Sequence, residues 1–390
     1  MWDFPTSMST APAPPPPSAS RKIGLATPVW VVVVIVVAAA VGGVGFFAGY
    51  EYRGSAAVTG VTANDTLSIL GAGTLTDTFP QLASALVNET PGVTDPIAAQ
   101  TYEGSLDITS AITSLAATAD VAAVADYRLI PQLLEPKFSS WEVVFATTQE
   151  VLIYNASLPA FHGVNASNWG QDLINDVSTP GNAPFGYWNA STDPNGYNEI
   201  FSMMLQGMLY DGGNVSAIYS HFYSGAPGTY AVANPKTTIF EHESHAALDI
   251  ETGVVSAVIT YKAVAVQNDL PYVLLNPIVG LMANNSTALA DYSGLTTQIY
   301  SSSLTLETVH PAPILFSVTV PLNAQNPALG AAFVHLILSP QGSAILSQMY
   351  DGTPAWTPIF PGWSPDPSAV PSVLAPDVVP LPSWAATILG

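Results

Sequence analysis

The chain of 390 residues contains no cysteine. Disulfides, iron–sulfur clusters and thiolate zinc sites are therefore excluded, and any metal site must use oxygen or imidazole ligands. Two common signatures are also missing, because no GK[ST] follows a glycine-rich loop and no G-x-S-x-G is present. No internal repeat of about 20 to 50 residues is visible, which argues against solenoids and propellers.

Charged side chains are scarce, at 9% of the chain, and basic ones are the scarcest. The part of the chain beyond residue 53 contains only four basic residues but 26 of the 28 acidic ones, so its formal charge is −22. The four are Arg128, Lys137, Lys236 and Lys262. Nucleic acid is therefore an implausible partner. Many carboxylates with few cations fit an acidic medium, in which carboxylates titrate to neutral and self-repulsion stays small.

Residues 28–50 form an apolar run without a charge, long enough to cross a bilayer. Arg21 and Lys22 precede this run, so the positive-inside rule places residues 1–27 in the cytoplasm and the chain after Glu51 outside. The run is longer than a typical signal-peptide core, and we expect an uncleaved anchor. Cleavage after the small residues near its end is the alternative.

Asn-X-Ser/Thr sequons are frequent after the apolar run, as expected of an external glycoprotein. The composition, rich in Ser, Thr and Asn, can also produce such triplets without any glycan. The sequon asparagines are Asn64, Asn88, Asn155, Asn165, Asn189, Asn214, Asn284 and Asn285.

Strand and helix patterns alternate after the anchor. Residues 67–88 show a buried strand, a glycine turn and an amphipathic helix, and residues 104–125 continue with a helix and a strand. This alternation predicts a parallel sheet that binds ligands at the carboxyl ends of its strands. Two β-rich stretches in residues 141–154 carry the chain into a second lobe, and residues 314–320 form a return strand.

Two glycine-rich turns place a hydroxyl where a helix is expected to begin. Gly71-Ala-Gly-Thr74 follows a strand pattern, and Glu103-Gly-Ser105 again opens a helix. Backbone N–H groups at a helix start favour an anion. Each turn taken alone is more often a glycine turn with a capping hydroxyl. Two such helix starts in one lobe can converge on a single oxyanion.

Three other candidate groups lie further along the expected ectodomain. Asp193 opens a D-P-N-G-Y loop before a helix expected from near Asn198, Glu243 lies at a helix start, and Tyr261 ends a strand. An Asp-Pro turn, a solvated carboxylate and a core tyrosine are the ordinary interpretations of these three residues.

His242, Glu243 and His245 suggest a metal site, but their spacing is H-E-x-H. The H-E-x-x-H motif of zinc proteases places both imidazoles on one helix face, and this spacing does not. We therefore expect no zinc-protease site here.

Several of these segments resemble the archaeal-type tungstate/molybdate-binding proteins of ABC transporters. The similarity runs with gaps over residues 66–350, and ADY-LIP and DP-x-GY are its most specific parts. The matching stretches are LSILGAGTLTDTF (67–79), YEGS (102–105), ADVAAVADYRLIPQLLEP (119–136), DPNGY (193–197), ETGVVSAVITYKAVAVQ (251–267) and ILFSVTVPLNAQNP (314–327).

The resemblance implies an α/β, two-lobed, periplasmic-binding-protein-like type II fold with hinge strands, here preceded by one N-terminal transmembrane helix. It also implies that an oxyanion binds in the cleft between the lobes. By position, the hydroxyl contacts of the family correspond to Thr74 and Ser105, and its tyrosine contact corresponds to Tyr261. Thr74 stands where the family usually has serine. The two carboxylates that approach the metal atom of the oxyanion correspond to Asp193 and Glu243.

Two carboxylates facing an oxyanion should repel it unless they become ligands. Molybdenum and tungsten can expand from four to six coordination with hard oxygen donors, whereas sulfur and phosphorus in sulfate and phosphate cannot readily do so. The carboxylate pair would therefore select against the common anions.

The expected protein is thus a monomeric solute-binding protein and not an enzyme. It is held at the outer face of the cell membrane, takes tungstate or molybdate as ligand, needs no cofactor, and works with an ABC permease and ATPase. The expected organisation is a cytoplasmic Pro-rich leader (1–27), an anchor (28–50), a linker (51–65), lobe 1 (66–149 and 313–350), lobe 2 (150–312) and a Pro-rich C-terminal tail (351–390).

Four alternatives stay open at this stage. Within the binding class, the chain could be a receptor for sulfate, phosphate or a similar anion. It could also be a receptor for a metal cation that uses His242, Glu243 and His245. From other classes, a hydrolase with Asp193 and Glu243 as acid and base, or a structural surface glycoprotein, is compatible with the composition.

Overall fold

The computed structural model describes most of the chain beyond residue 65, in the ranges 66–90, 99–240, 243–282, 288–301, 304–350 and 352–389. The predicted leader, anchor and linker therefore lie outside the described residues. In the described ranges no single helix is long and apolar enough to cross a bilayer. Only the pair Pro327–Ile337 and Pro340–Leu346, bent by 70°, meets that test of length and composition together.

A seven-stranded mixed sheet forms the first lobe (lobe 1). The edge strand β2 is parallel to β1, and β1 is parallel to β3, whereas β14 is antiparallel to both β3 and β4. The sheet is therefore not wholly parallel as expected, because β14 returns to it from the second lobe. Its strand order is β18 (Val378–Pro380), β17 (Thr357–Ser364), β4 (Val143–Thr147), β14 (Leu315–Thr319), β3 (Val121–Val124), β1 (Ile69–Ala72) and β2 (Gln100–Glu103).

Helices cover both faces of this sheet. Alternate residues of β3 belong to two separate apolar clusters, one with Val121 and Ala123 and the other with Ala122 and Val124, as the period of two requires. The first cluster includes α2, which packs against α10 and α11, and the second includes α3 and a π-helical turn. These elements are α2 (Phe79–Glu89), α10 (Pro327–Ile337), α11 (Pro340–Leu346), α3 (Ser105–Ser114) and η3 (Ile130–Leu134).

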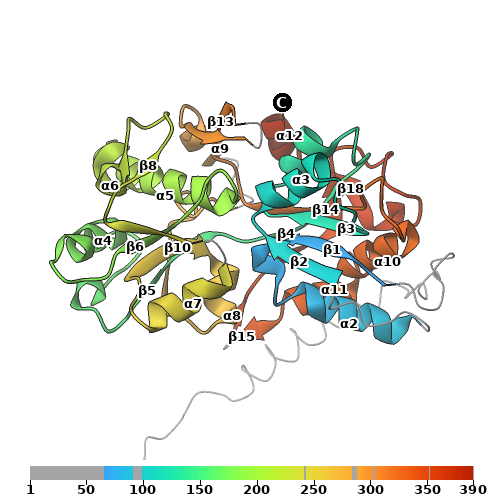
Figure 1. Cartoon of the computed structure of the whole chain (residues 1–390), viewed down its shortest axis with the longest axis horizontal. Helices are drawn as coiled ribbons and strands as arrows, with labels where there is room; N and C mark the ends of the chain where they lie inside the picture. Colours follow the sequence, from blue (N-terminus) through green and yellow to red (C-terminus); the bar gives the residue numbers. More distant parts are fainter. Residues whose placement is uncertain are drawn as a thin grey trace, which may run out of the picture. The chain divides into compact units, whose positions relative to one another are not determined.

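A five-stranded sheet forms the second lobe (lobe 2), which Figure 1 shows in green to yellow. Its strand order is β11 (Tyr272–Leu274), β5 (Glu150–Tyr154), β10 (Ala257–Tyr261), β6 (Phe185–Trp188) and β9 (Thr237–Phe240). Its helices are α4 (Trp169–Ser178), α5 (Pro194–Tyr210), α6 (Ser216–Phe222), α7 (Glu243–Glu251), α8 (Lys262–Gln267) and α9 (Ala288–Tyr292). Met203 and Met204 are buried in α5.

The remaining elements are short. They are η1 (Gly73–Leu75), η4 (Pro159–Phe161), η5 (Ala375–Asp377), α12 (Ser383–Leu389), and the strand pairs β7 (Tyr223–Ser224) with β8 (Val232–Ala233), β12 (Thr297–Tyr300) with β13 (Leu306–Val309), and β15 (Met349–Tyr350) with β16 (Thr353–Pro354).

The chain crosses between the lobes along extended segments. β4 belongs to lobe 1 and β5 to lobe 2, and only two buried residues, Thr148 and Gln149, separate them. The chain returns from β13 to β14. The α/β architecture of two lobes joined by crossing strands is therefore confirmed.

The first glycine turn differs from the expectation. The segment predicted to be a turn continues β1 for two residues and then forms the short 3-10 helix Gly73–Leu75. Helix α2 begins only at Phe79. Thr74 therefore lies in a separate buried turn and not at the start of α2.

The prediction of a proline-rich tail from residue 351 is wrong. β17 pairs with β4 and β18, so this segment extends the sheet of lobe 1. The register of β17 on β4 shifts between Pro358 and Trp363, and Pro361 lies inside that interruption. Proline is tolerated in a strand at such a break, because no ladder hydrogen bond is required of its nitrogen.

Trp356, just before β17, anchors this C-terminal segment. Its side chain is buried, its indole N–H donates to the Thr78 hydroxyl at 3.1 Å, and its ring packs edge-on against Phe316 with centroids 4.7 Å apart. We expect Trp356→Ala to lower the free energy of unfolding by about 3–5 kcal/mol, because it leaves a cavity in the core. Urea unfolding measures this loss. The half-buried Trp384→Ala is the control, and an equal loss in both variants would contradict the assignment.

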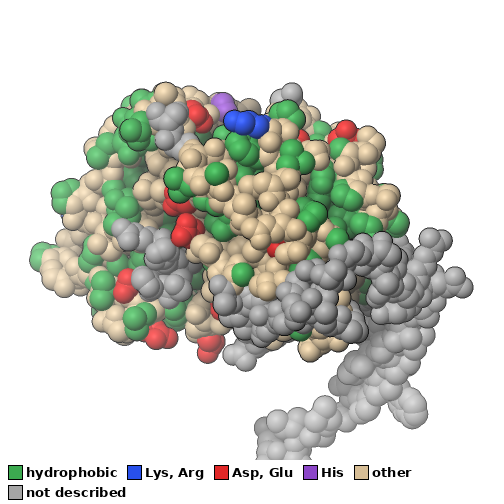
Figure 2. Space-filling model, turned by 45° about the vertical axis from the view of Figure 1, so that its right-hand side comes forward, with side chains coloured by type: hydrophobic (Ala, Val, Ile, Leu, Met, Phe, Trp, Pro, Cys, Tyr) green, Lys and Arg blue, Asp and Glu red, His purple; other side chains and the backbone are tan. Residues whose placement is uncertain are grey.

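The surface carries few charges. Figure 2 shows a face on which uncharged side chains predominate and acidic ones are scattered. The sequon asparagines that the structure describes are exposed or half-buried, so none of them is closed to a glycan. Glycosylation itself stays a prediction. The described sequon asparagines are Asn88, Asn155, Asn165, Asn189 and Asn214.

Candidate functional site

The two lobes touch at the start of α3. The N–H of Leu106 donates to the carbonyl oxygen of Thr192 at 3.0 Å, which is a backbone hydrogen bond from lobe 1 to lobe 2. A Cβ added to Gly104 would lie 2.3 Å from the same oxygen and 3.3 Å from the Cβ of Asp193. Glycine is therefore required at position 104, and the contact brings the start of α3, with Ser105 next to Gly104, against the start of α5 at Asp193.

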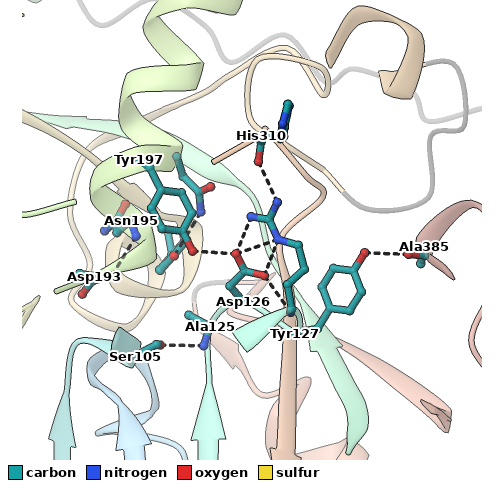
Figure 3. Close-up of polar contacts among 12 residues, drawn as sticks. Ser105, Ala125, Asp126, Tyr127, Asp193, Asn195, Tyr197, His310 and Ala385 are labelled. Carbon is teal, nitrogen blue, oxygen red and sulfur yellow. Dashed lines mark hydrogen bonds and ion pairs between the residues drawn. The ribbon is translucent and has the colours of Figure 1, made fainter. Parts of the chain in front are cut away.

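Ser105 is buried at the first position of α3. Its hydroxyl oxygen accepts a hydrogen bond from the N–H of Ala125 at 2.9 Å (Figure 3). Accepting this bond fixes the hydroxyl and leaves its proton available for donation. The predicted hydroxyl contact is therefore held at a helix start, where backbone N–H groups favour an anion.

Asp193 caps the N-terminus of α5. Its Oδ1 accepts from the N–H of Asn195 at 2.8 Å, and Pro194 is the first helical residue. The helix therefore begins four residues earlier than the start expected near Asn198, because Asp at the cap followed by Pro is a favourable helix start.

The Asp193 carboxyl has an unusual acidity. Burial raises its pKa to about 7, against the opposing effect of the Asn195 N–H, and the charge of Asp107 raises it further. A carboxyl of this kind is only partly ionised near neutral pH.

Thr74 is buried in η1, and its hydroxyl has no hydrogen-bond partner within the part of the chain that the structure describes. Buried hydroxyls are normally hydrogen-bonded, so a ligand is a natural partner for this one. Helix α7 of lobe 2 packs against η1. The turn that carries Thr74 therefore also lies at the boundary between the lobes.

Tyr261 ends β10 and is fully buried. Its hydroxyl oxygen accepts from the side-chain amide of Asn198 on α5, at 3.4 Å. Its ring packs edge-on against Phe316 of β14, with centroids 5.7 Å apart. Tyr261 therefore links α5 to the sheet of lobe 1.

Glu243 is the first residue of α7, the helix that packs against the turn of Thr74. The side chains of Glu243 and His245, and all of His242, lie outside the described residues, so their roles stay predictions. Among the described residues, no three His, Asp or Glu side chains gather where they could hold a metal ion.

Sequence reasoning missed a second polar cluster at this boundary. Asp126 and Arg128 follow β3 in lobe 1, and the Asp126 carboxylate accepts a hydrogen bond from the hydroxyl of Tyr197 on α5 at 2.6 Å (Figure 3). All three residues are buried. The only signal in the sequence was that ADYRLIP and DPNGY are the segments most typical of the resembled family. That signal did not indicate which residues of the two segments contact each other.

A family profile described as bacterial extracellular solute-binding protein matches residues 67–349. The chain belongs to this family of solute-binding proteins. Solute-binding proteins are transport proteins and not catalysts, in agreement with the expectation that the chain is not an enzyme. The family places the binding domain outside the cytoplasm.

Some relatives of this solute-binding protein are named only as solute-binding proteins, and others are named for the ligand that they bind. An uncharacterized solute-binding protein of Methanoculleus marisnigri is 30% identical over 79% of this chain and 86% of its own length. The molybdate/tungstate-binding protein WtpA of Thermococcus kodakarensis is 28% identical over 63% of this chain and 69% of its own. The substrate-binding protein of an ABC transporter from Agrobacterium tumefaciens has the same fold, with a TM-score of 0.51, 13% identity, and coverage of 85% of this chain and 91% of its own.

Proposed function

We propose that this solute-binding protein captures tungstate or molybdate between its lobes and delivers the oxyanion to the permease and ATPase of an ABC importer. The observation that carries the proposal is the backbone contact at Gly104, which brings the start of α3, with Ser105, against Thr192 and Asp193 at the start of α5 in lobe 2. The names of the WtpA relatives from Thermococcus kodakarensis and Pyrococcus abyssi support the choice of ligand.

In the proposed site, two kinds of side chain contact different atoms of the oxyanion. Thr74, Ser105 and Tyr261 hold the oxygens of the oxyanion through their hydroxyls. Asp193 and Glu243 bond to the molybdenum or tungsten atom, which can accept two further oxygen ligands. Sulfate and phosphate cannot accept them, so the same carboxylates only repel those anions.

The proposed place of the protein is the outer face of the cell membrane. The apolar run at residues 28–50, preceded by Arg21 and Lys22, would serve as an uncleaved anchor. Closure of two hinged lobes around the ligand would then present the loaded form to the permease.

Calorimetric titration of the purified protein with tungstate, molybdate, sulfate and phosphate tests the proposal. We expect binding of tungstate or molybdate at least about 100-fold tighter than binding of sulfate, a difference of about 2.7 kcal/mol. Equal affinity for all four anions would instead favour a simple anion receptor. Thermal stabilisation by zinc or manganese, without stabilisation by tungstate, would favour a cation receptor.

The buried hydroxyl of Thr74 gives a direct test of the site. Thr74→Val keeps the shape of the side chain and removes the hydroxyl, so we expect tungstate to bind about tenfold more weakly, since one hydrogen bond to an anion is lost. Thr74→Ser keeps the hydroxyl and should retain most of the affinity. Isothermal titration calorimetry measures both variants.

Thr109→Val is the matched control for Thr74→Val. Thr109 is buried in the same lobe, and its hydroxyl donates to the carbonyl oxygen of Leu106 within α3. This control should lose stability without losing affinity. Weaker binding in Thr109→Val than in Thr74→Val would show that the effect comes from the lobe as a whole and not from the hydroxyl of Thr74.

A further inference from the structure

Asp126, Arg128 and Tyr197 form a buried polar bridge from lobe 1 to lobe 2. The Tyr197 hydroxyl donates to Oδ2 of Asp126 at 2.6 Å, and the Nε of Arg128 donates to both carboxylate oxygens of Asp126 at 2.9 and 3.0 Å. The Nη1 of Arg128 donates to the carbonyl oxygen of His310 at 2.8 Å. Residue 310 lies on the segment that returns from β13 to β14, so Arg128 is fixed to the second crossing between the lobes.

The charge of this bridge is balanced inside the protein. Burial alone would raise the pKa of Asp126, but the charge and hydrogen bonds of Arg128 outweigh it and hold that pKa below its ordinary value. Asp126 is therefore ionised at neutral pH. A hydroxyl that donates to an ionised carboxylate makes a stronger bond than one that donates to a neutral acceptor.

Both ends of the bridge adjoin residues of the proposed ligand site. Tyr197 lies four residues after Asp193, which is about one turn along α5. Asp126 directly follows Ala125, whose N–H donates to the hydroxyl of Ser105 (Figure 3). The bond between Tyr197 and Asp126 therefore joins the chain segment that carries Asp193 to the segment that holds Ser105.

We propose that Asp126, Arg128 and Tyr197 act as an interlobe latch. Arg128 holds the carboxylate of Asp126 in place, and Tyr197 binds it when the lobes close. These are positioning residues, because they act on the ligand through Asp193 and Ser105. The effect on ligand affinity rests on the proposed function, whereas the effect on lobe closure does not.

A cavity beside the latch leaves room for such a motion. It has a volume of about 420 Å³ and is lined from both lobes, with Arg128 and Leu129 on one side and Tyr197 and Ile299 on the other. Tyr197 lines this cavity, so a hinge motion that separates it from Asp126 begins beside existing space.

Spin-label distances test the latch in the full chain. The protein has no cysteine, so Ser114→Cys and Ser220→Cys, both exposed and on opposite lobes, provide two unique labelling sites. In this background Tyr197→Phe removes only the latch hydroxyl. We expect the ratio of short to long interlobe distances to fall about tenfold, with and without tungstate, and tungstate to bind about tenfold more weakly.

Tyr127→Phe is the matched control. Tyr127 is fully buried, and its hydroxyl donates to the carbonyl oxygen of Ala385 at 2.9 Å within lobe 1. Tyr127→Phe should lower the melting temperature as Tyr197→Phe does, without changing the interlobe distances or the affinity for tungstate.

The same distances and affinities in both variants would overturn the latch. If the parent protein binds no tungstate, the proposed ligand is wrong. In that case the latch would still be supported if a smaller fraction of molecules has the short interlobe distance in Tyr197→Phe than in Tyr127→Phe.

Discussion

Replacing Asp193 with asparagine is expected to weaken tungstate binding about 100-fold, or by about 2.7 kcal/mol. Asparagine is as good a helix cap as aspartate, so it can still accept from the Asn195 N–H that Asp193 binds at 2.8 Å. The start of α5 and the contact with lobe 1 should therefore persist. What is lost is the anionic oxygen that would bond to the metal atom. Calorimetry with tungstate and sulfate measures the loss.

The selectivity of Asp193→Asn is as informative as its affinity. Without the negative charge, repulsion of sulfate decreases while coordination of tungsten is lost, so the margin of tungstate over sulfate should narrow. Ser339→Ala provides a control for capping, because the Ser339 hydroxyl accepts from the Gly342 N–H at the start of α11 in lobe 1. An unchanged margin in Asp193→Asn would remove Asp193 from the ligand set.

The protein is expected to be more stable at pH 4.5 than at pH 8. Burial raises the pKa of Glu142 and of Glu199 well above the ordinary value of 4.5. For Glu142 the Ser317 hydroxyl opposes the effect of burial only in part, and the charges of Glu135 and Asp126 raise its pKa further. The Tyr223 hydroxyl donates to Glu199, which opposes the effect of burial only in part.

The direction of this pH dependence follows from proton linkage. A carboxyl with a raised pKa binds more protons in the folded chain than in the unfolded one, so its stabilising contribution is complete below pH 4.5. That contribution is lost as the pH rises toward the folded pKa, by up to about 1.4 kcal/mol per pH unit and carboxyl. Asp126, whose pKa is lowered, acts in the opposite sense, but only below about pH 4. Maximum stability is therefore expected in mildly acidic solution.

Urea unfolding between pH 4.5 and pH 8 measures this dependence. Glu142→Gln should flatten the slope by about 1.4 kcal/mol per pH unit and stabilise the protein at pH 8, because a neutral amide takes up no proton on folding. Glu103→Gln, at an exposed position on the edge strand β2, should leave the slope unchanged. Stability that rises steadily from pH 4.5 to pH 8 would contradict both this prediction and the inferred acidic medium.

Local sequence was sufficient for the parts of the site that follow from chain order. Ser105 at the start of its helix, the strands on either side of residues 148–149 and the return strand before residue 320 are found where they were predicted. Each depends on neighbours a few residues away, such as glycine before the helix or a run of buried aliphatic residues. The start of α5 was misplaced because the D-P pair was interpreted as a turn, although it is equally typical of a helix start.

The sequence by itself determined the α/β alternation, the two lobes, the scarcity of cations and the hydroxyl and carboxyl candidates for an oxyanion. Only the tertiary structure decided that the prolines after residue 351 extend a sheet, that burial raises the pKa of Asp193, and that Tyr197 meets Asp126. The reason is distance along the chain: Tyr197 and Asp126 are 71 residues apart, and Tyr127 and Ala385 are 258 apart. Contacts and burial of this kind exist only once the lobes have packed.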